Sequence, residues 1–255
     1  MISQFTQRIL WSTLALALVL AGCQRKYEED VLAYPPDVNA IIVTSDYAPR
    51  TIGATGGYQA WIDTIKLERD CVVTYYKPDG SFYLTEQHHE IYPWSNAIRI
   101  SAQEPQGEFV WQLSADGFKI LQAGTSWVLR PEYEMQDVLR AVLDMTTAPV
   151  RLLDSTGLVK GPEPVKVQGL WHHPIERAGG GEPRLPKAVF YQNIESGLVD
   201  MIWFAGVAER KFLAVRGYDY SKARDQQVLV PGKIEIFEAD AKGVLQQRLV
   251  KIDFK

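Results

Sequence analysis

The chain has 255 residues, of which 46% are hydrophobic and 23% are charged, and its formal net charge is −4. These values are ordinary for a soluble globular protein, and the length suits one domain or one domain with a tether. A mildly acidic chain without a basic stripe is a poor match for nucleic acid, which argues against DNA- and RNA-binding functions.

The N-terminal segment has the pattern of a secretory signal. Arg8 precedes an apolar run from Ile9 to Leu20, which is short for a membrane span. The run ends in Leu20-Ala21-Gly22-Cys23, which resembles the lipobox of bacterial lipoproteins. The resemblance implies that residues 1–22 are a signal peptide, that signal peptidase II recognises Leu20, Ala21 and Gly22, and that Cys23 is lipidated. The alternative is an ordinary secretory peptide followed by a chance cysteine.

Residues 23–54 are predicted to be a flexible tether, anchored in a membrane by the acyl chains on Cys23. The segment contains the charged run Lys26–Asp30 and the helix-resistant pair Pro35-Pro36. Gln24 is not the aspartate that retains enterobacterial lipoproteins at the inner membrane. By that analogy we expect a lipid-anchored protein of the bacterial cell envelope, at the outer membrane and facing the periplasm. Inner-membrane residence is the alternative where the organism sorts differently.

A single domain is predicted from residue 55 to residue 255. Its first helix should start near Thr55 and end before Asp70, because apolar residues recur there at helical spacing. From Cys71 the apolar period changes to two, and turn residues separate the runs, which predicts an antiparallel sheet with one apolar face. With Cys23 acylated, Cys71 has no disulfide partner. We expect it to be a buried, inert thiol and not a reactive one.

A second helix is predicted after Arg130-Pro131, because an apolar stripe follows at spacings of three and four residues. The members of that stripe are Met135, Val138, Leu139, Val142 and Met145. Strands then return at 165–171, 187–193, 198–205, 211–216, 228–230, 233–238 and 244–254, with a long loop at 174–186. The strand at 198–205 is apolar on both sides, which predicts cover on both sides, by a helix on one and by a ligand on the other.

The order of these elements resembles that of the LolA/LolB/LppX superfamily of lipoprotein- and lipid-carrying proteins. The likeness covers about residues 57–254 and includes the opening helix with Trp61, the 75–84 hairpin, the run Phe109–Trp111 and the run Leu229–Ile236. It implies a mainly β α+β fold, an unclosed antiparallel β-barrel of ten to eleven strands with helices as a lid. No residue of this chain is matched individually to a functional residue of that superfamily.

The resemblance and the apolar pattern predict a concavity that holds a hydrophobic ligand, such as a lipid or the acyl chain of a lipoprotein. Each buried CH₂ of such a chain contributes about 0.8 kcal/mol, so binding needs few polar contacts. The candidate lining residues are large apolar side chains on the predicted helices and strands. They are Trp61, Phe109, Trp111, Met135, Leu139, Trp203 and Phe204. The alternative is that each is ordinary core.

Two other classes of function stay open. An envelope hydrolase is the weaker one, because no P-loop, Rossmann or G-x-S-x-G motif occurs. Glu86, His88 and Glu90 share one strand face and have metal-binding chemistry, but a solvated polar face is the simpler interpretation, so we expect no metal and no cofactor. The third class is a structural lipoprotein that presents its surface to envelope partners. A filled interior favours that class, and an open one favours the carrier.

Overall fold

The computed structural model describes residue 32 and residues 47–104, 107–122, 135–153, 158–161, 163–177, 187–205 and 212–255. Within these ranges the chain forms a 13-stranded antiparallel sheet, a two-stranded ribbon and a few helices. The strands of the first half are β1 (Leu67–Tyr76), β2 (Phe82–Tyr92), β3 (Ala97–Glu104), β4 (Gly107–Ser114) and β5 (Gly117–Gln122). The helices are α2 (Tyr47–Ala54), α3 (Tyr58–Asp63), α4 (Met135–Thr146) and α5 (Ala148–Arg151).

The second half of the chain supplies the remaining strands. They are β6 (Leu158–Lys160), β7 (Val165–Val167), β8 (Leu170–Arg177), β9 (Ala188–Asn193), β10 (Val199–Ala205), β11 (Phe212–Tyr218), β12 (Ser221–Lys222), β13 (Leu229–Val230), β14 (Lys233–Ala239) and β15 (Leu245–Phe254). The described strands outnumber the predicted ten to eleven, because several are only two or three residues long. Strands β12 and β13 pair with each other outside the main sheet.

The order of strands shows how the sheet is assembled. It runs β5-β4-β3-β2-β1-β15-β14-β11-β10-β9-β8-β6, with β7 also paired to β8. The pairing of β1 with β15, which sets Cys71 opposite Phe254, therefore joins the two halves of the domain. Strands β5 and β6 end the path without pairing to each other, so the sheet is unclosed. This confirms the predicted mainly β, unclosed antiparallel architecture.

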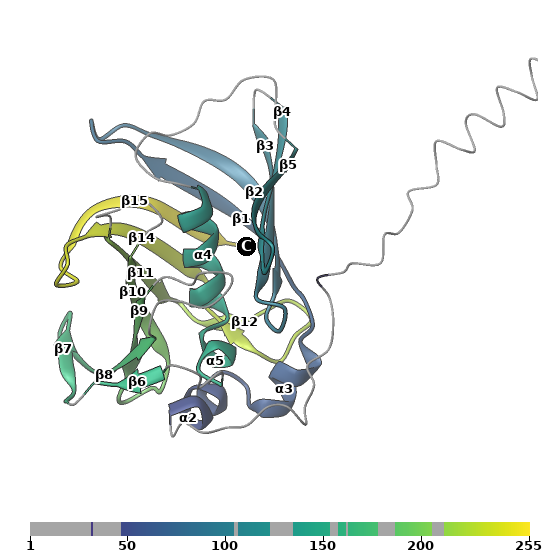
Figure 1. The fold of residues 1–255 in the computed structure, drawn as a ribbon. Coiled ribbons are helices and arrows are strands. Elements are labelled where there is room, and N and C mark those ends of the chain that lie inside the picture. The colour runs from purple at the N-terminus through teal and green to yellow at the C-terminus, as the bar shows by residue number, and fades with distance from the viewer. Residues whose placement is uncertain are drawn as a thin grey trace, which may run out of the picture. The chain divides into compact units, whose positions relative to one another are not determined.

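The sheet curves around α4, which runs along its concave side (Figure 1). In the sequence α4 lies between the two edge strands, and it contacts β3 and β4 in one half of the sheet and β10, β11 and β14 in the other. Every residue of α4 except Gln136 is buried. The sequence pattern predicted a helix with one apolar stripe lying over the sheet; the structure instead encloses this helix on nearly all sides.

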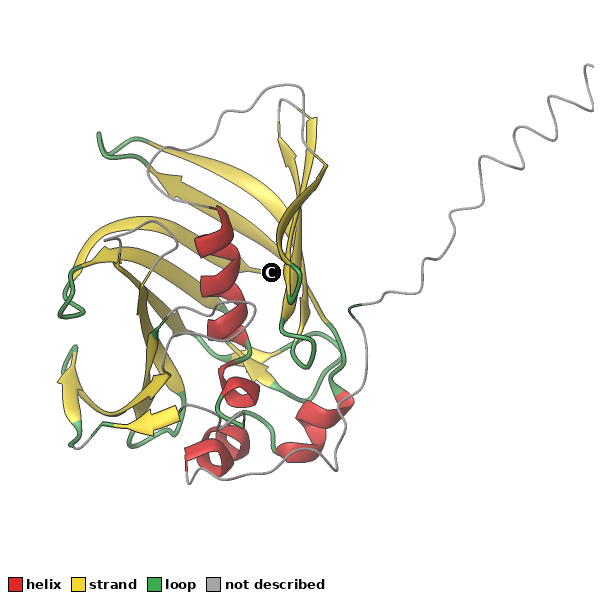
Figure 2. Cartoon of the chain, viewed as in Figure 1, coloured by secondary structure: helices red, strands yellow, loops and turns green. Residues whose placement is uncertain are grey.

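Helices α2, α3 and α5 gather at one end of the sheet (Figure 2). Ala48, Thr51 and Ile52 of α2 are buried, and the Thr51 hydroxyl donates a hydrogen bond to the Gly197 carbonyl at 2.9 Å. The last eight residues of the predicted tether are therefore a packed helix, and the folded domain begins by Tyr47. The predicted 55–69 helix is also too long, because α3 ends at Asp63 and β1 starts at Leu67.

A close approach fixes the junction between α2 and α3. Gly56 has a φ of 116°, and a Cβ added there would lie 2.6 Å from the backbone oxygen of Gln227. The neighbouring Thr55 carbonyl accepts a hydrogen bond from the Leu229 N–H at 2.9 Å. Glycine is required at position 56 for two reasons. It adopts this positive φ without strain, and it has no Cβ to collide with the β12–β13 loop.

The region 165–186 differs from the sequence-based expectation. The predicted strand 165–171 is two strands, β7 and β8, joined by a turn in which Gln168 and Gly169 have φ of 50° and 89°. Strand β8 continues to Arg177 and pairs with β9, so residues 174–177 of the predicted loop are strand, and residues 178–186 lie outside the described residues. Among the described residues, no helix is both long and apolar enough to cross a membrane.

Candidate functional site

Six of the seven candidate lining residues lie in one continuous hydrophobic core. Each of the six is at most 5% exposed, so none of them faces solvent. They are Trp61, Phe109, Trp111, Met135, Leu139 and Phe204. The rings of Phe109 and Trp111 stack with centroids 5.5 Å apart on the inner face of β4. These residues therefore gather inside the sheet, and helix α4 lies where the ligand was expected. Their role as a ligand lining stays a prediction.

Helix α4 occupies the concavity, and its apolar residues face both halves of the sheet. Val138, Leu139 and Val142 are each at most 3% exposed. At the C-terminal end of α4, Met145 fits against Gly217 of β11. A Cβ added at Gly217 would lie 2.7 Å from Met145 Sδ and 3.1 Å from its Cγ, so the absence of a side chain on β11 makes room for α4.

Trp203 lies on the opposite side of the sheet from the other candidates. Its ring stacks on Phe212 with centroids 5.2 Å apart, and its indole N–H donates to the Asp240 carbonyl at 3.1 Å. Its prediction as a lining residue is wrong, because alternate side chains of β10 point to opposite faces. Strand β10 is apolar on both faces because aromatic side chains of the same chain, and not a ligand, pack on its outer face.

A strip of buried charge accompanies the apolar residues of α4. Asp144 is 1% exposed, and its Oδ2 accepts a hydrogen bond from Nη2 of Arg177 on β8 at 2.9 Å. One turn earlier, Arg140 Nη1 lies 3.8 Å from Asp144 Oδ1 and donates to Asn96 Oδ1 at 3.2 Å. The strip thus ties α4 to β8 on one side and to the β2–β3 turn on the other.

The charges of this strip determine the ionisation of Asp144. Burial by itself would raise the pKa of the Asp144 carboxyl, but the nearby charges of Arg177, Arg140 and Arg151 hold it below its usual value. Asp144 is therefore a buried carboxylate among three arginines. Sequence reasoning missed this group; the only available signal was the i, i+4 spacing of Arg140 and Asp144 on the predicted helix.

A second buried polar group lies on the inner face where β1 and β2 pair. His89 Nε2 lies 3.0 Å from Gln87 Oε1 and 3.4 Å from Cys71 Sγ. Burial lowers the pKa of His89 to about 3 and raises the pKa of the Cys71 thiol to about 12. Cys71 is thus a free, buried thiol that stays protonated, as predicted. A neutral thiol beside a neutral imidazole does not provide the thiolate that nucleophilic catalysis needs.

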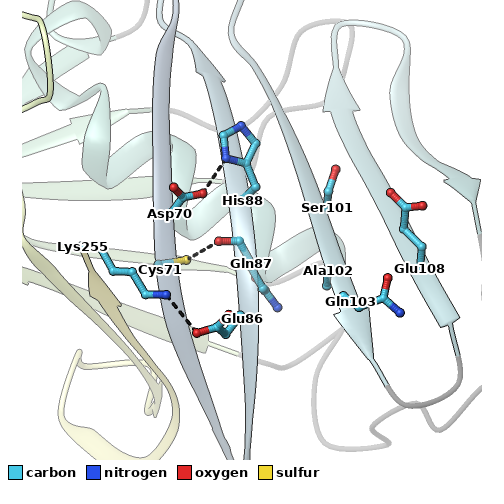
Figure 3. A pocket seen from close by; sticks show the side chains of 10 residues that line it. All are labelled: Asp70, Cys71, Glu86, Gln87, His88, Ser101, Ala102, Gln103, Glu108 and Lys255. Carbon is cyan, nitrogen blue, oxygen red and sulfur yellow. Dashed lines mark hydrogen bonds and ion pairs between the residues drawn. The ribbon is translucent and has the colours of Figure 1, made fainter.

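The outer face of β1–β4 contains a cavity of about 420 Å³ (Figure 3). Polar and charged residues predominate among those that line it, and Cys71, Gln87 and Ala102 reach it from strands whose side chains there point inward. The other lining residues are Asp70, Glu86, His88, Ser101, Gln103, Glu108 and Lys255. Lys255 Nζ donates to Glu86 at 2.9 Å, and His88 Nδ1 lies 2.8 Å from Asp70 Oδ1. This volume is within the range of small-molecule sites, but the lining does not suit a hydrocarbon chain.

Next to this cavity, Glu68, His88 and Glu90 place one ligand atom each within 4.8 Å of the others. The predicted trio of Glu86, His88 and Glu90 is replaced by this one, because Glu68 lies directly opposite Glu90 in the β1–β2 pairing. Lys66 forms ion pairs with both glutamates, and Arg99 pairs with Glu90 at 3.3 Å. These cations already neutralise the carboxylates, so the cluster is a charged, partly solvated sheet face.

Comparison with known proteins gives structural likeness without sequence likeness. No protein-family profile matches the chain, and no curated protein matches it significantly. A LolA-superfamily protein from Nitrosomonas europaea superposes with a TM-score of 0.52 at 11% identity, covering 84% of this chain and 92% of that one. A DUF1329-family protein from Desulfovibrio piger gives 0.44 at 11% identity, covering 82% and 89%.

A domain assigned to outer-membrane lipoprotein sorting, from Vibrio parahaemolyticus, gives a TM-score of 0.41 at 8% identity over 74% of this chain and 83% of that one. The Nitrosomonas protein is the one of these three whose TM-score exceeds 0.5, and it carries the comparison. The residues predicted for lipidation and its recognition, Leu20–Cys23, lie outside the described residues. Within the described ranges, the curved sheet with its enclosed helix has the LolA-like fold that the sequence resemblance implied.

Proposed function

We propose that the protein is a lipid-anchored carrier of the bacterial cell envelope that binds a hydrophobic ligand, an acyl chain or lipid, on the concave face that α4 now covers. The observation that carries the proposal is that a single helix occupies the apolar interior of an unclosed sheet. The ligand enters by exchange with α4 and not by diffusion into an open cavity.

The energies of the two occupants support such an exchange. Burying one aliphatic side chain contributes about 1.5–3 kcal/mol, so the five apolar residues of the α4 stripe contribute on the order of 10 kcal/mol. An acyl chain with roughly fourteen CH₂ groups contributes a similar amount, at about 0.8 kcal/mol for each group. The burial of a fatty acyl chain of ordinary length therefore offsets the burial free energy that α4 loses when it moves away.

The envelope location rests on the lipobox-like run before Cys23. Acyl chains on Cys23 hold the protein at a membrane, and the residues from Gln24 onward separate the anchor from the domain. We place the protein at the outer membrane, facing the periplasm. A carrier held at a membrane surface has its ligand source or acceptor within reach, which suits transfer or sorting of lipids or lipoproteins.

The test measures how acyl-chain length affects binding to the full chain. Fluorescent acyl probes of increasing length are titrated against wild type, Phe204→Ala and Trp203→Ala. These neighbours on β10 point to opposite faces, so Phe204→Ala should shift the preferred chain length upward while Trp203→Ala keeps the wild-type preference. Absence of probe binding, or equal effects of both variants, would overturn the proposal. Intact mass of the same preparation should show lipid on Cys23; an unprocessed chain starting at Met1 contradicts the anchor.

The alternative is a structural lipoprotein without a lipid ligand, and the enclosed position of α4 favours it. That alternative requires α4 to stay in place permanently. The charged strip on α4 argues against this, because burying ions stabilises a permanently packed interface less well than apolar residues of the same volume. An envelope hydrolase has no support from the described residues, since the buried Cys71–His89 pair is held in its neutral state.

A further inference from the structure

The charged strip on α4 leaves one guanidinium group incompletely paired. Arg177 is 8% exposed and gives a single hydrogen bond to Asp144, through Nη2. Its Nε–H is buried and has no acceptor among the described residues. An arginine side chain recognises an oxyanion best through two parallel hydrogen bonds from adjacent nitrogens, so Asp144 leaves half of this fork unused.

Asp144 is also incompletely satisfied by its partners. Its Oδ1 accepts no hydrogen bond among the described residues, and its ion pair with Arg140 is long, at 3.8 Å. A buried carboxylate normally has its oxygens paired, because an unpaired charged oxygen retains its desolvation cost. The contact between Asp144 and Arg177 is therefore one that a better-fitting anion can replace.

The position of Arg177 relates it to the apolar interior. Arg177 and Ile175 share the inner face of β8, and the Arg177 guanidinium lies 5.3 Å from the centroid of the Phe190 ring on β9. Phe190 is fully buried in the same core as Leu139 and Phe204. Arg177 is thus a cation next to a long apolar surface, on the strand adjacent to the edge strand β6. This arrangement is complementary to an amphiphile with one anionic end.

We propose that Arg177 is an oxyanion site for the phosphate of an anionic phospholipid, and that Asp144 of α4 is the internal anion that occupies this site when no ligand is bound. The inference rests on the proposed carrier function and adds the ligand class. When the lipid binds, its phosphate oxygens take the Nε and Nη2 hydrogens of Arg177, its acyl chains take the place of the α4 stripe, and Asp144 leaves with the helix.

The test compares two lipids that share the same pair of oleoyl chains. Phosphatidylglycerol has the phosphate, and diacylglycerol lacks it. Both compete with a fluorescent acyl probe for the full-length protein, and the ratio of their dissociation constants is measured. For wild type we expect phosphatidylglycerol to bind about tenfold more tightly, which corresponds to one good charge-assisted contact. Asp144→Asn should increase this ratio severalfold, because it removes the internal competitor.

The decisive variant is the double substitution Asp144→Leu with Arg177→Met. It replaces the Asp144–Arg177 pair by apolar side chains, a change that buried ion pairs usually tolerate without unfolding. Arg140 keeps its hydrogen bond to Asn96, and circular dichroism verifies the fold. The ratio should fall to about one. The matched control, Arg99→Met, removes an arginine from the outer face and should keep the wild-type ratio. Inorganic phosphate should weaken phosphatidylglycerol binding but not diacylglycerol binding.

Each contrary outcome has a separate meaning. Equal binding of the two lipids to wild type, or an unchanged ratio in the double variant, overturns the oxyanion site and leaves the carrier function intact. Binding of inorganic phosphate as tight as that of phosphatidylglycerol overturns the lipid assignment, since the site would then serve a free anion. Absence of binding by either lipid or by the probe overturns the carrier function, and the inference fails with it.

Discussion

The two faces of strand β4 show how differently the sheet uses its two sides. On the inner face, Phe109, Trp111 and Leu113 are each at most 3% exposed and pack into the core around α4. On the outer face, Glu108 lines a cavity of about 420 Å³ together with several other charged residues. The apolar side is thus occupied by a helix of the same chain, while the polar side is open. For a hydrophobic ligand, the relevant space is the one that is occupied, because hydrocarbon gains little from a hollow lined by carboxylates.

The largest expected difference between the two faces of β4 is in how much a substitution to alanine destabilises the protein. Trp111→Ala removes a ring that is 1% exposed and should lower the free energy of unfolding by about 3–5 kcal/mol. Val110→Ala, one residue away on the outer face, should cost about 0.5 kcal/mol. Urea denaturation of both variants measures the difference. Similar losses in the two variants would show that the outer face is packed as tightly as the inner one, and the contrast would be lost.

A smaller effect concerns pH and involves His89 on the inner face. Burial lowers its pKa in the folded state to about 3, against about 6.5 in an unfolded chain. The unfolded state therefore binds the proton first on acidification, so this contribution to stability is complete above pH 6.5 and is lost as the pH falls toward 3. Between pH 7 and pH 5 the protein should lose about 1–3 kcal/mol of stability.

The variant His89→Gln tests the assignment of this loss to His89. Glutamine keeps a neutral hydrogen-bonding side chain next to Gln87 but has no proton to gain in this range. The pH dependence of unfolding between pH 7 and pH 5 should become shallower by the contribution of His89. An unchanged slope would mean that other groups cause the acid sensitivity, and that the inner face does not hold His89 in its neutral form.

The elements with a regular apolar period could be predicted from the sequence. Strands such as β4 alternate apolar and polar residues because one face packs on α4, and α4 itself repeats apolar residues at helical spacing. Six of the seven candidate lining residues lie in the core around α4, and their role in lining a ligand site stays a prediction. The exception is Trp203. It was misplaced because β10 is apolar on both faces, and a period of two cannot show which face is the inner one.

Other features depend on partners that are distant in the sequence. Pro174 suggested a loop, yet it lies within β8. It stands between the residues of β8 that pair with β7 and those that pair with β6. Its missing N–H therefore removes no hydrogen bond from either pairing. The Asp144–Arg177 pair joins residues 33 positions apart on a helix and a strand, which no local pattern can reveal. Whether α4 covers or fills the concavity was likewise a question of tertiary packing.

The most direct test of the account is whether α4 must move for a ligand to bind. The added Cβ at Gly217 lies 3.1 Å from Met145 Cγ, so cysteines at positions 145 and 217 are within reach of a disulfide that fixes α4 to β11. Binding of a fluorescent acyl probe to the double variant Met145→Cys with Gly217→Cys is measured oxidised and after reduction, with both single variants as controls. We predict that oxidation abolishes binding and that reduction restores it. Equal binding by the oxidised and reduced forms would contradict the exchange of α4 for ligand.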